Sequence, residues 1–458
     1  MGRIFGTDGI RAKPYEFPLE KGILLSLGKA FSRLFDKVAL LPAKRGRKRR
    51  VLFIRDTRGS GKEILKFLAR GFIENNWDVE DLGVLPTGSL SYLVRFWKCD
   101  LGCVLSASHN PAEFNGVKFF GPNGCKIPDD WEKELENLIL SDRSVKKKQI
   151  SSSCSNSMES DAFDLYQDFL RSRIKAQVDF SRARIALDCA NGAAYKIAPK
   201  VYSLLGIQTR DIAITPNGLN INLNSGSLAP QKLSKEVRAF NAHCGFAYDG
   251  DADRLAVVDE KGRAIPGEWV LATVALRRKA RLRPGSDALV TTAFSNYALG
   301  KFLNKHGVDV VESEVGDSKV LAKLFEMGLG FGGESSGHYI WPGALPAADG
   351  ILASLFMTEW MITDNKRLSQ LIVSFPLFAQ VKVNLKTPAQ RPDIKTLKGF
   401  SSEVKKVKSH LGGNGRLVVR YSGTEPVLRI LIEGDIEKKK LHAMAESLVA
   451  AYEKNAWH

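Results

Sequence analysis

Long hydrophobic runs are absent from this sequence of 458 residues. The longest nearly uncharged apolar stretch, residues 351–357, is soon followed by Glu359, so it is far shorter than the ~20 residues of a membrane-spanning helix. The first seventeen residues contain five charged side chains and no apolar run, which excludes the hydrophobic region of a secretory signal. We therefore expect a cytoplasmic protein that has no membrane partner.

Cysteine is also scarce. The sequence contains six cysteines, and no two of them are spaced as a CxxC pair. They fall in segments that we expect to be core or linker. We therefore expect reduced thiols that carry no chemistry of their own.

Acidic residues are outnumbered, with 50 Asp and Glu against 67 Lys and Arg, which gives a formal net charge of +17. Such an excess is typical of a phosphate-rich partner, either a nucleic acid or a small phosphorylated substrate. The basic residues cluster at 44–50, 146–148 and 277–283, beside expected element ends and without interleaved aromatic side chains. Such runs are typical of solvated loops, so we favour the small substrate and do not expect nucleic acid to bind.

What the sequence does contain is a globular alternation of strands and helices. With 44% hydrophobic residues it can bury a core, and its length predicts two to four domains. A helix at 19–37 and strands at 51–56 and 102–108 form a first cycle. A polar, Ser-rich segment at 141–160 then predicts a linker between domains.

The alternation restarts after this linker. A second cycle contains strands at 184–189 and 245–251, and a third begins with a strand at 255–260. The last part of the chain differs, because three strands precede one closing helix, which predicts an antiparallel sheet. We therefore predict an α/β protein with three similar mixed α/β domains plus a C-terminal α+β domain. The expected domains are residues 1–155, 156–253, 254–368 and 369–458.

Four loops that follow expected strands carry the candidate chemistry. Ligands of open α/β sheets bind beyond the carboxyl ends of the strands, so polar residues there suggest a function. The first loop, 106–121, contains Ser108 and His109 directly after an apolar strand, with Lys118 nearby. A hydroxyl beside an imidazole suits a nucleophile or a phosphate acceptor. The alternative is a Ser/Asn/Pro turn that satisfies its own backbone.

The second loop carries three carboxylates at alternate positions, Asp249, Asp251 and Asp253. Such spacing points all three toward one place, and hard oxygen ligands of this kind suit Mg²⁺ or Ca²⁺. An EF-hand is excluded, because Arg254 stands where its turn needs glycine and a strand follows where a helix should begin. Three surface aspartates without a ligand are the alternative, but their mutual repulsion favours a cation.

The third and fourth loops suit a phosphorylated sugar. Residues 332–338 place Glu334, Ser336 and His338 at alternate positions among glycines, where they can grip adjacent hydroxyls. Residues 420–426 offer a guanidinium, two hydroxyls and a backbone amide to phosphate oxygens. These groups belong to Arg420, Ser422, Thr424 and Gly423. Either loop alone is equally consistent with a turn built on Ser and Gly.

In this order, the four loops resemble those of the α-D-phosphohexomutase superfamily. The segment FGTDGIR at 5–11 is also similar to the family's N-terminal signature, and the match spans almost the whole chain. The resemblance implies four domains with the active site in a central cleft. It implies that Ser108 is phosphorylated, and that one Mg²⁺ per active site binds Ser108 together with the three aspartates of the second loop.

The resemblance also implies roles for the other loop residues. Lys118, His109 and Arg11 would surround the phosphoryl group during transfer, and Arg254 would bind substrate beside the metal loop. Glu334, Ser336 and His338 would hold sugar hydroxyls. Arg420, Ser422, Gly423 and Thr424 would clamp the phosphate that does not react. The residue that takes the hydroxyl proton is left open.

Within the superfamily, residues 218–227, 248–262 and 314–321 most resemble the phosphoglucosamine mutases. The implied reaction interconverts glucosamine 6-phosphate and glucosamine 1-phosphate through a phosphoserine enzyme. A sugar bisphosphate is the implied intermediate and activator, and the product would feed amino-sugar nucleotide and cell-wall precursor synthesis. The implied partner is thus a small phosphorylated hexosamine, and a homodimer is left open.

Two alternatives remain. Ser335 occupies the variable position of the third loop, where the glucosamine enzymes usually have Gln or Asn, so a phosphomannomutase or phosphoglucomutase is the nearer rival. Tyr421 and Ala252 also depart from the family pattern, without removing a ligand. The basic runs favour, as a different class, a non-catalytic protein that binds phosphosugars or nucleic acid. The complete set of catalytic residue types argues against that class.

Overall fold

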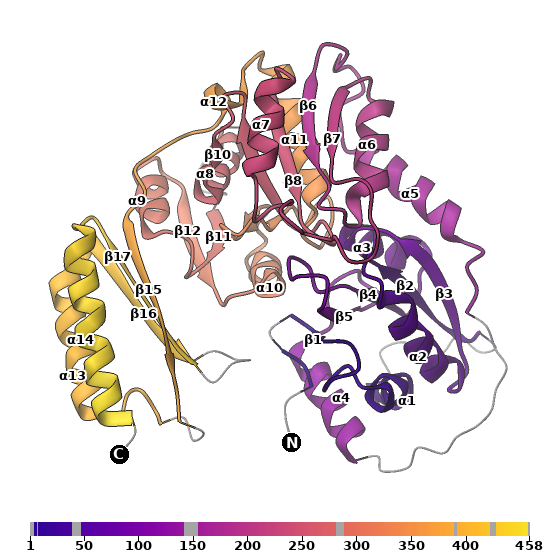
Figure 1. The fold of residues 1–458 in the computed structure, drawn as a ribbon, viewed down its shortest axis with the longest axis horizontal. Helices are drawn as coiled ribbons and strands as arrows, with labels where there is room; N and C mark the ends of the chain where they lie inside the picture. The colour runs from indigo at the N-terminus through magenta and orange to yellow at the C-terminus, as the bar shows by residue number, and fades with distance from the viewer. Residues whose placement is uncertain are drawn as a thin grey trace.

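The structure is a computed structural model, which describes residues 4–6, 8–38, 47–141, 154–280, 288–388, 392–421 and 427–456. The chain forms four units in sequence order, and each unit has a sheet of its own (Figure 1). Figure 1 shows the C-terminal unit beside the third, with both of its long helices on the outer side of its sheet. Three α/β units and a distinct C-terminal unit are the fold class that the sequence predicts.

The first unit contains a five-stranded sheet in the order β1-β5-β4-β2-β3. Its strands are β1 (Ile10–Ala12), β2 (Arg49–Arg55), β3 (Trp77–Val84), β4 (Leu101–Leu105) and β5 (Asn115–Phe120). Its helices are α1 (Lys21–Val38), α2 (Gly61–Ile73), α3 (Thr87–Phe96) and α4 (Asp129–Ser141). Strands β2, β3 and β4 are parallel, whereas β5 returns antiparallel to β4. All of β4 is buried, as is typical of a continuous apolar strand that is covered on both faces.

The second unit repeats this plan, with the sheet order β10-β9-β8-β6-β7. Its strands are β6 (Arg184–Asp188), β7 (Gln208–Ile212), β8 (Cys244–Tyr248), β9 (Leu255–Asp259) and β10 (Ala264–Ile265). Its helices are α5 (Glu159–Ser172), α6 (Ala194–Leu204) and α7 (Gln231–Ala239). Strand β9 lies beyond the boundary that we expect at residue 253, yet it pairs antiparallel with β8. A short loop returns the chain along the same sheet, so the second sheet continues to residue 265.

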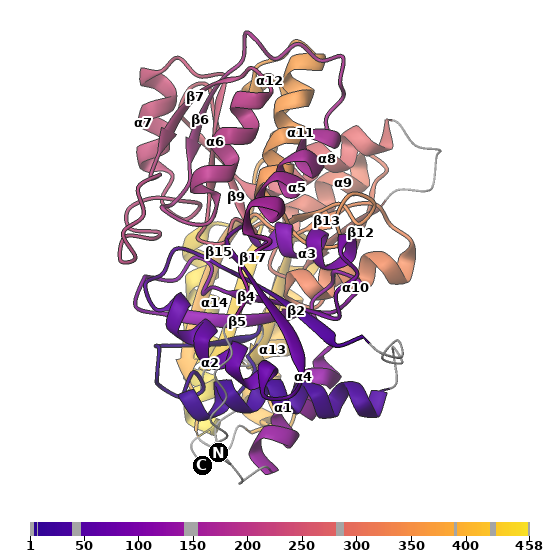
Figure 2. The ribbon, with the colours of Figure 1, turned by 90° about the vertical axis from the view of Figure 1, so that its right-hand side faces the viewer.

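The third unit has a four-stranded sheet in the order β12-β11-β13-β14. Its strands are β11 (Ala288–Thr292), β12 (Asp309–Ser313), β13 (Gly332–Gly333) and β14 (Tyr339–Ile340). Its helices are α8 (Gly267–Lys279), α9 (Tyr297–Lys305), α10 (Asp317–Met327), α11 (Gly350–Thr363) and α12 (Leu368–Leu371). Helix α10 lies against the first unit in both views (Figures 1 and 2), where Lys319 pairs with Asp129 at 2.6 Å.

Helix α11 contains the apolar stretch that is too short for a membrane span. The side chain of Asp349 accepts hydrogen bonds from the amides of Ile351 and Leu352 and so caps the helix. Ten of the fourteen residues of α11 are buried, as expected of a helix that is apolar on all sides. Its Ser354 hydroxyl lies 2.8 Å from Tyr248 Oη, which belongs to the second unit. No helix in the described ranges is long and apolar enough to cross a membrane.

The C-terminal unit is an antiparallel sheet in the order β15-β17-β16. Its strands are β15 (Ala379–Lys386), β16 (Gly415–Tyr421) and β17 (Val427–Gly434). Its helices are α13 (Lys398–Leu411) and α14 (Lys438–Ala456), with a 3₁₀ turn at Gly412–Asn414. The apolar core of this unit is drawn entirely from its own residues, whereas the largest apolar cluster runs through the other three units.

The basic runs are described only in part, because residues 44–46, 146–148 and 281–283 lie outside the described residues. Arg277, in the last turn of α8, belongs to a run that we expect to be solvated, but its side chain is paired. Its guanidinium pairs with both carboxylate oxygens of Asp364, one of them at 2.9 Å, and lies 5.1 Å from the centre of the Trp360 ring. Arg277 therefore anchors the two ends of helices α8 and α11 to each other.

Candidate active site

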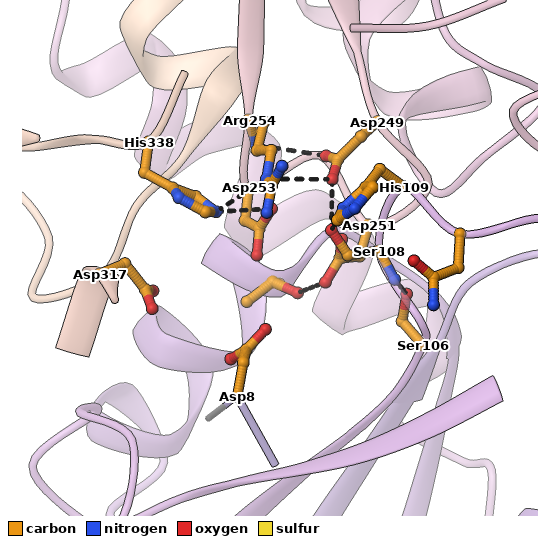
Figure 3. Close-up of polar contacts among 12 residues, drawn as sticks. Asp8, Ser106, Ser108, His109, Asp249, Asp251, Asp253, Arg254, Asp317 and His338 are labelled. Atoms are coloured by element: carbon orange, nitrogen blue, oxygen red, sulfur yellow. Dashed lines mark hydrogen bonds and ion pairs between the residues drawn. The ribbon is translucent and has the colours of Figure 1, made fainter. Parts of the chain in front are cut away.

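The first two predicted loops meet at the carboxyl ends of β4 and β8 (Figure 3). Ser108 is buried, and its hydroxyl donates a hydrogen bond of 2.6 Å to Asp249 Oδ2. His109 Nδ1 lies 3.4 Å from the same hydroxyl oxygen. The structure therefore brings together Ser108, His109 and Asp249, three of the residues to which the family resemblance assigns roles in one site.

Ser108 has a backbone conformation that residues other than glycine seldom adopt. Its φ is +52°, in the left-handed region, which costs free energy for any residue except glycine. The buried guanidinium of Arg58 fixes the loop by donating to the carbonyl oxygens of Ser108 at 3.0 Å and Asn110 at 2.7 Å. Asn222 Nδ2 donates to the same Ser108 carbonyl at 2.9 Å. These donors hold the hydroxyl of Ser108 toward the carboxylates.

The three aspartates of the second loop form one buried cluster. One carboxylate oxygen from each of Asp249, Asp251 and Asp253 lies within 4.8 Å of the other two. Among the described residues, Asp251 Oδ1 has no hydrogen-bond donor, and Asp253 Oδ1 has only an ion-pair contact with His338 Nε2 at 3.3 Å. Their other oxygens accept from Lys118 Nζ, at 3.0 and 3.1 Å. Buried carboxylate oxygens without a donor are what a divalent cation requires, so the residues present fit a Mg²⁺ site.

The charges of this cluster perturb its protonation. Burial, together with repulsion by Asp253 and Asp251, raises the pKa of Asp249 to about 8. Burial alone would lower the pKa of Lys118, but the carboxylates around it hold that pKa well above its ordinary value. Lys118 is therefore a permanent cation at the edge of a site that carries more negative charge than one lysine neutralises.

The third loop brings His338 into the same cluster, from the opposite side in Figure 3. His338 Nδ1 lies 2.8 Å from Glu334 Oε2, and Nε2 lies 3.3 Å from Asp253 Oδ1. Burial opposes the charged form, but Asp253 and Glu334 raise the pKa of His338 to about 10. Burial and the nearby cation of Arg254 instead lower the pKa of His109 to about 3. At neutral pH the two imidazoles therefore differ in charge.

A cavity of about 300 Å³ opens beside these residues. Its lining includes Arg11, Arg254, Glu334, Ser335, Ser336, His338 and Arg420. The guanidinium of Arg420 lies 4.8 Å from the centre of the Phe294 ring, on the third unit. Ser422, Gly423 and Thr424 lie outside the described residues. Arg420 is thus the one of the four predicted phosphate-binding residues of this loop whose position is described, and it lines the same cavity as the third loop.

Several residues of the site lie outside the sequence motifs from which we predicted it. Arg429 stands opposite Arg420 in the β16–β17 ladder and lines the same cavity. Thr87, at the start of α3, donates from its hydroxyl to Asp251 Oδ2 at 2.8 Å. Lys126 pairs with Asp8 and Asp317, at 2.5 and 2.6 Å. Arg58 could have been predicted as a site residue from the sequence, because the polar stretch that contains it directly follows the expected strand at 51–56.

Comparison with protein-family models supplies independent findings. The domains described as "Phosphoglucomutase/phosphomannomutase, alpha/beta/alpha domain" I, II and III match residues 2–146, 164–262 and 266–378. The C-terminal domain of the same family matches residues 379–451. The chain therefore belongs to the phosphoglucomutase/phosphomannomutase family, and it is an enzyme of the phosphohexomutase class, as the order of its four loops predicts.

Individual relatives agree over the full length. A phosphoglucosamine mutase of Bdellovibrio bacteriovorus is 36% identical over 453 residues, which cover 99% of this chain and 98% of the relative. One of Desulforapulum autotrophicum is 37% identical over 461 residues, covering 97% and 98%. Among solved structures, a phosphoglucomutase/phosphomannomutase family protein of Burkholderia thailandensis has a TM-score of 0.76 at 22% identity, covering 99% of this chain and 97% of the other. At that identity the structural match supports the fold alone.

Proposed function

We propose that this chain is a Mg²⁺-dependent phosphoglucosamine mutase, which interconverts glucosamine 6-phosphate and glucosamine 1-phosphate. The observation that carries the proposal is the Ser108 hydroxyl, buried and 2.6 Å from one carboxylate of a three-aspartate cluster. The full-length relatives with that name support the choice of substrate. The expected location is the cytoplasm, and the proposal needs no second copy of the chain.

The metal would be held by Asp249, Asp251 and Asp253, together with an oxygen from Ser108 or its phosphate. When bound, the ion supplies Lewis-acid neutralisation of the charge on the phosphoryl group. The buried Asp251 Oδ1, which has no hydrogen-bond donor among the described residues, supports this assignment. The chain's own side chains perform the other roles in the proposed mechanism.

In the forward direction, the bond between phosphorus and Ser108 Oγ breaks as a bond forms between phosphorus and the 1-hydroxyl oxygen of glucosamine 6-phosphate. The hydroxyl proton leaves to a base, and the product is the 1,6-bisphosphate. After the bisphosphate turns around, the bond between phosphorus and the 6-oxygen breaks as Ser108 Oγ takes the phosphoryl group, the 6-oxygen takes up the proton given up in the first transfer, and glucosamine 1-phosphate is released. The two transfers balance, so the enzyme ends as phosphoserine again.

Fixed cations support both transfers. Lys118, Arg254 and the protonated His338 surround the place where the phosphoryl charge develops, and charges that are already oriented need no reorganisation during the reaction. Glu334 and His338 would bind sugar hydroxyls. Arg420, with Ser422, Gly423 and Thr424, would hold the distant phosphate, and we add Arg429 because it lines the cavity beside Arg420. Binding one end of the substrate orients the other for attack.

The test uses the purified full chain with Mg²⁺ and a catalytic amount of glucosamine 1,6-bisphosphate. The parent should convert glucosamine 6-phosphate, and Ser108→Ala should abolish conversion and the phosphoserine seen by intact mass. Ser203→Ala, an exposed serine on α6, is the matched control and should retain activity. Full activity of Ser108→Ala would contradict the proposal.

A second candidate is a phosphomannomutase or phosphoglucomutase, which Ser335 favours because it lines the substrate cavity at the family's variable position. Comparison of kcat/KM for glucosamine, mannose and glucose 6-phosphates separates the two candidates. A preference for the mannose or glucose compound would favour this second candidate, while the mechanism would stay the same.

A further inference from the structure

A second cavity lies between the first and third units and shares no lining residue with the active-site cavity. Its volume is about 890 Å³, which lies in the range of small-molecule sites. The first unit contributes residues at the start of β2, at the end of α3 and after β5, and the third contributes Phe325 from α10 and two prolines that follow β14. Residues that are far apart in sequence thus form one concave surface.

The cavity carries an excess of positive charge. Five basic residues line it, Arg47, Lys48, Arg49, Arg95 and Lys98, against the single carboxylate of Asp100. That carboxylate is already occupied, because it accepts from Arg47 at 2.9 Å and from the amide of Arg50 at 2.8 Å. Within the described part of the chain, the side chains of Arg95 and Lys98 have no hydrogen bond or ion pair. Two cations with no carboxylate partner favour an anionic ligand.

The same cavity has flat apolar walls. Trp97 lies between the two unpaired cations in sequence, and Phe325 reaches in from the third unit. Phe325 is 55% exposed, so its ring is accessible to a ligand in this cavity. Aromatic faces of this kind bind flat rings by stacking, and arginine beside them adds to the attraction. A sugar phosphate would leave these faces uncovered.

We propose that this cavity binds a nucleoside di- or triphosphate, with its phosphates on Arg95 and Lys98 and its base against Trp97 and Phe325. The combination of two unpaired cations and two aromatic side chains in the lining of one cavity favours a mononucleotide over inorganic phosphate, which needs no ring. Bound there, the nucleotide contacts both units at once. The proposal concerns a site outside the catalytic cleft and does not depend on the mutase reaction.

The test is calorimetric titration of the full chain with AMP-PNP, an ATP analogue that cannot transfer its terminal phosphate, in excess Mg²⁺. We expect saturable binding of one molecule per chain. Arg95→Ala combined with Lys98→Ala should weaken binding at least about tenfold, because charge-assisted hydrogen bonds are lost. Phe325→Leu, which keeps the apolar volume and loses the ring, should weaken it about fivefold or more.

Control measurements distinguish binding in this cavity from binding in the catalytic cleft or elsewhere on the basic surface. Arg171→Ala, an exposed arginine on α5, should bind AMP-PNP like the parent, and thermal unfolding checks that each variant is folded. Excess glucosamine 6-phosphate should not displace AMP-PNP. Displacement by that sugar phosphate, unchanged affinity in the Arg95/Lys98 variant, equal affinity for tripolyphosphate, or tighter binding of a single-stranded RNA oligonucleotide would each overturn the proposal.

Discussion

The ammonium group of Lys126 lies 2.6 Å from a carboxylate oxygen of Asp317, and this pair joins the first unit to the third. Lys126 follows β5, whereas Asp317 opens α10. The same ammonium is 2.5 Å from Asp8, and Asp8 lies 3.2 Å from Lys118 Nζ. Charges of alternating sign therefore run from α10 into the aspartate cluster, and the position of Lys118 depends on residues outside the predicted loops.

Lys126→Met should remove the cation from this row and leave two largely buried carboxylates without it. Breaking a buried ion pair costs about 3 kcal/mol or more, so the thermal midpoint should fall. The ammonium group of Lys118 should also shift relative to the aspartate cluster. A shift of a catalytic group by about 1 Å can lower kcat/KM on the order of 10²-fold. Lys126→Arg keeps the positive charge and should lose less of the thermal midpoint and less of kcat/KM than Lys126→Met. The exposed Lys133→Met, on α4, should change neither, and a loss of the same size there would contradict this role.

Mg²⁺ should stabilise the parent protein against thermal unfolding. An ion that binds only the folded state at 100 times its Kd contributes about 2.7 kcal/mol. Asp251→Asn should abolish most of this gain, because it removes one carboxylate charge from the cluster. Asp130→Asn changes an aspartate that is 90% exposed and should keep the full gain. Equal Mg²⁺ shifts in the two variants would exclude the aspartate cluster as the metal site.

Glu433→Ala should loosen the attachment of the C-terminal unit. The Glu433 carboxylate is fully buried and accepts from Arg416 at 2.9 Å, from Gln380 at 2.6 Å and from the Tyr297 amide at 3.2 Å. Its loss leaves part of the Arg416 charge unpaired, which costs about 3–5 kcal/mol for a buried pair. Thermal unfolding measures the cost, and proteolysis at residues 372–378 should accelerate. Glu437→Ala, at an exposed glutamate, serves as the control.

Asp349 predicts a pH dependence of stability. Burial raises the pKa of Asp349 to about 6 from an ordinary value of 3.8. Because the folded state holds this proton more tightly, the stability it contributes is complete below pH 3.8 and is lost as the pH rises through 6. Asp349→Asn keeps a good helix cap without titrating. From pH 4 to 7 the variant should therefore gain on the parent by about 2.4 kcal/mol, which is most of the ~3 kcal/mol that the full shift gives at ~1.36 kcal/mol per pKa unit.

The comparison follows thermal or denaturant unfolding of both proteins at several pH values. Asp168→Asn changes an exposed aspartate on α5 and should follow the parent at every pH. A difference between Asp349→Asn and the parent that stays flat, or that falls as the pH rises, would contradict the raised pKa of Asp349.

The sequence could predict the residues of the site whose chemistry is local. Ser108 follows a strand of five apolar or small residues, and the three aspartates alternate along one loop, so both could be singled out as candidates from local sequence, while their roles were predicted from the family resemblance. The fold class could be predicted for the same reason, because alternation of apolar strands and helices is a local property. Neither inference required knowledge of which strands pair.

The remaining features depend on contacts between distant segments. Strand β9 has the sequence of any apolar strand, and only pairing decides that it belongs to the second sheet. Arg277 belongs to a basic run that is typical of solvent, yet its partner Asp364 lies 87 residues further on. Lys126 and Asp317 are separated by 191 residues. No local pattern encodes such partners, because each contact is decided by how whole units pack.

The apolar core of the C-terminal unit contains only residues of that unit. Its contacts with the third unit include polar ones, and Arg416 makes two of them. That guanidinium reaches Glu312 at 2.5 Å and the Ser295 carbonyl at 2.6 Å. A joint of this kind exposes little apolar surface when it opens, since water replaces each hydrogen bond that is broken. In the proposed reaction the bisphosphate must rotate before its second transfer. If this unit moves during that rotation, its own apolar core stays covered, and the cost of opening is confined to the polar contacts that are broken.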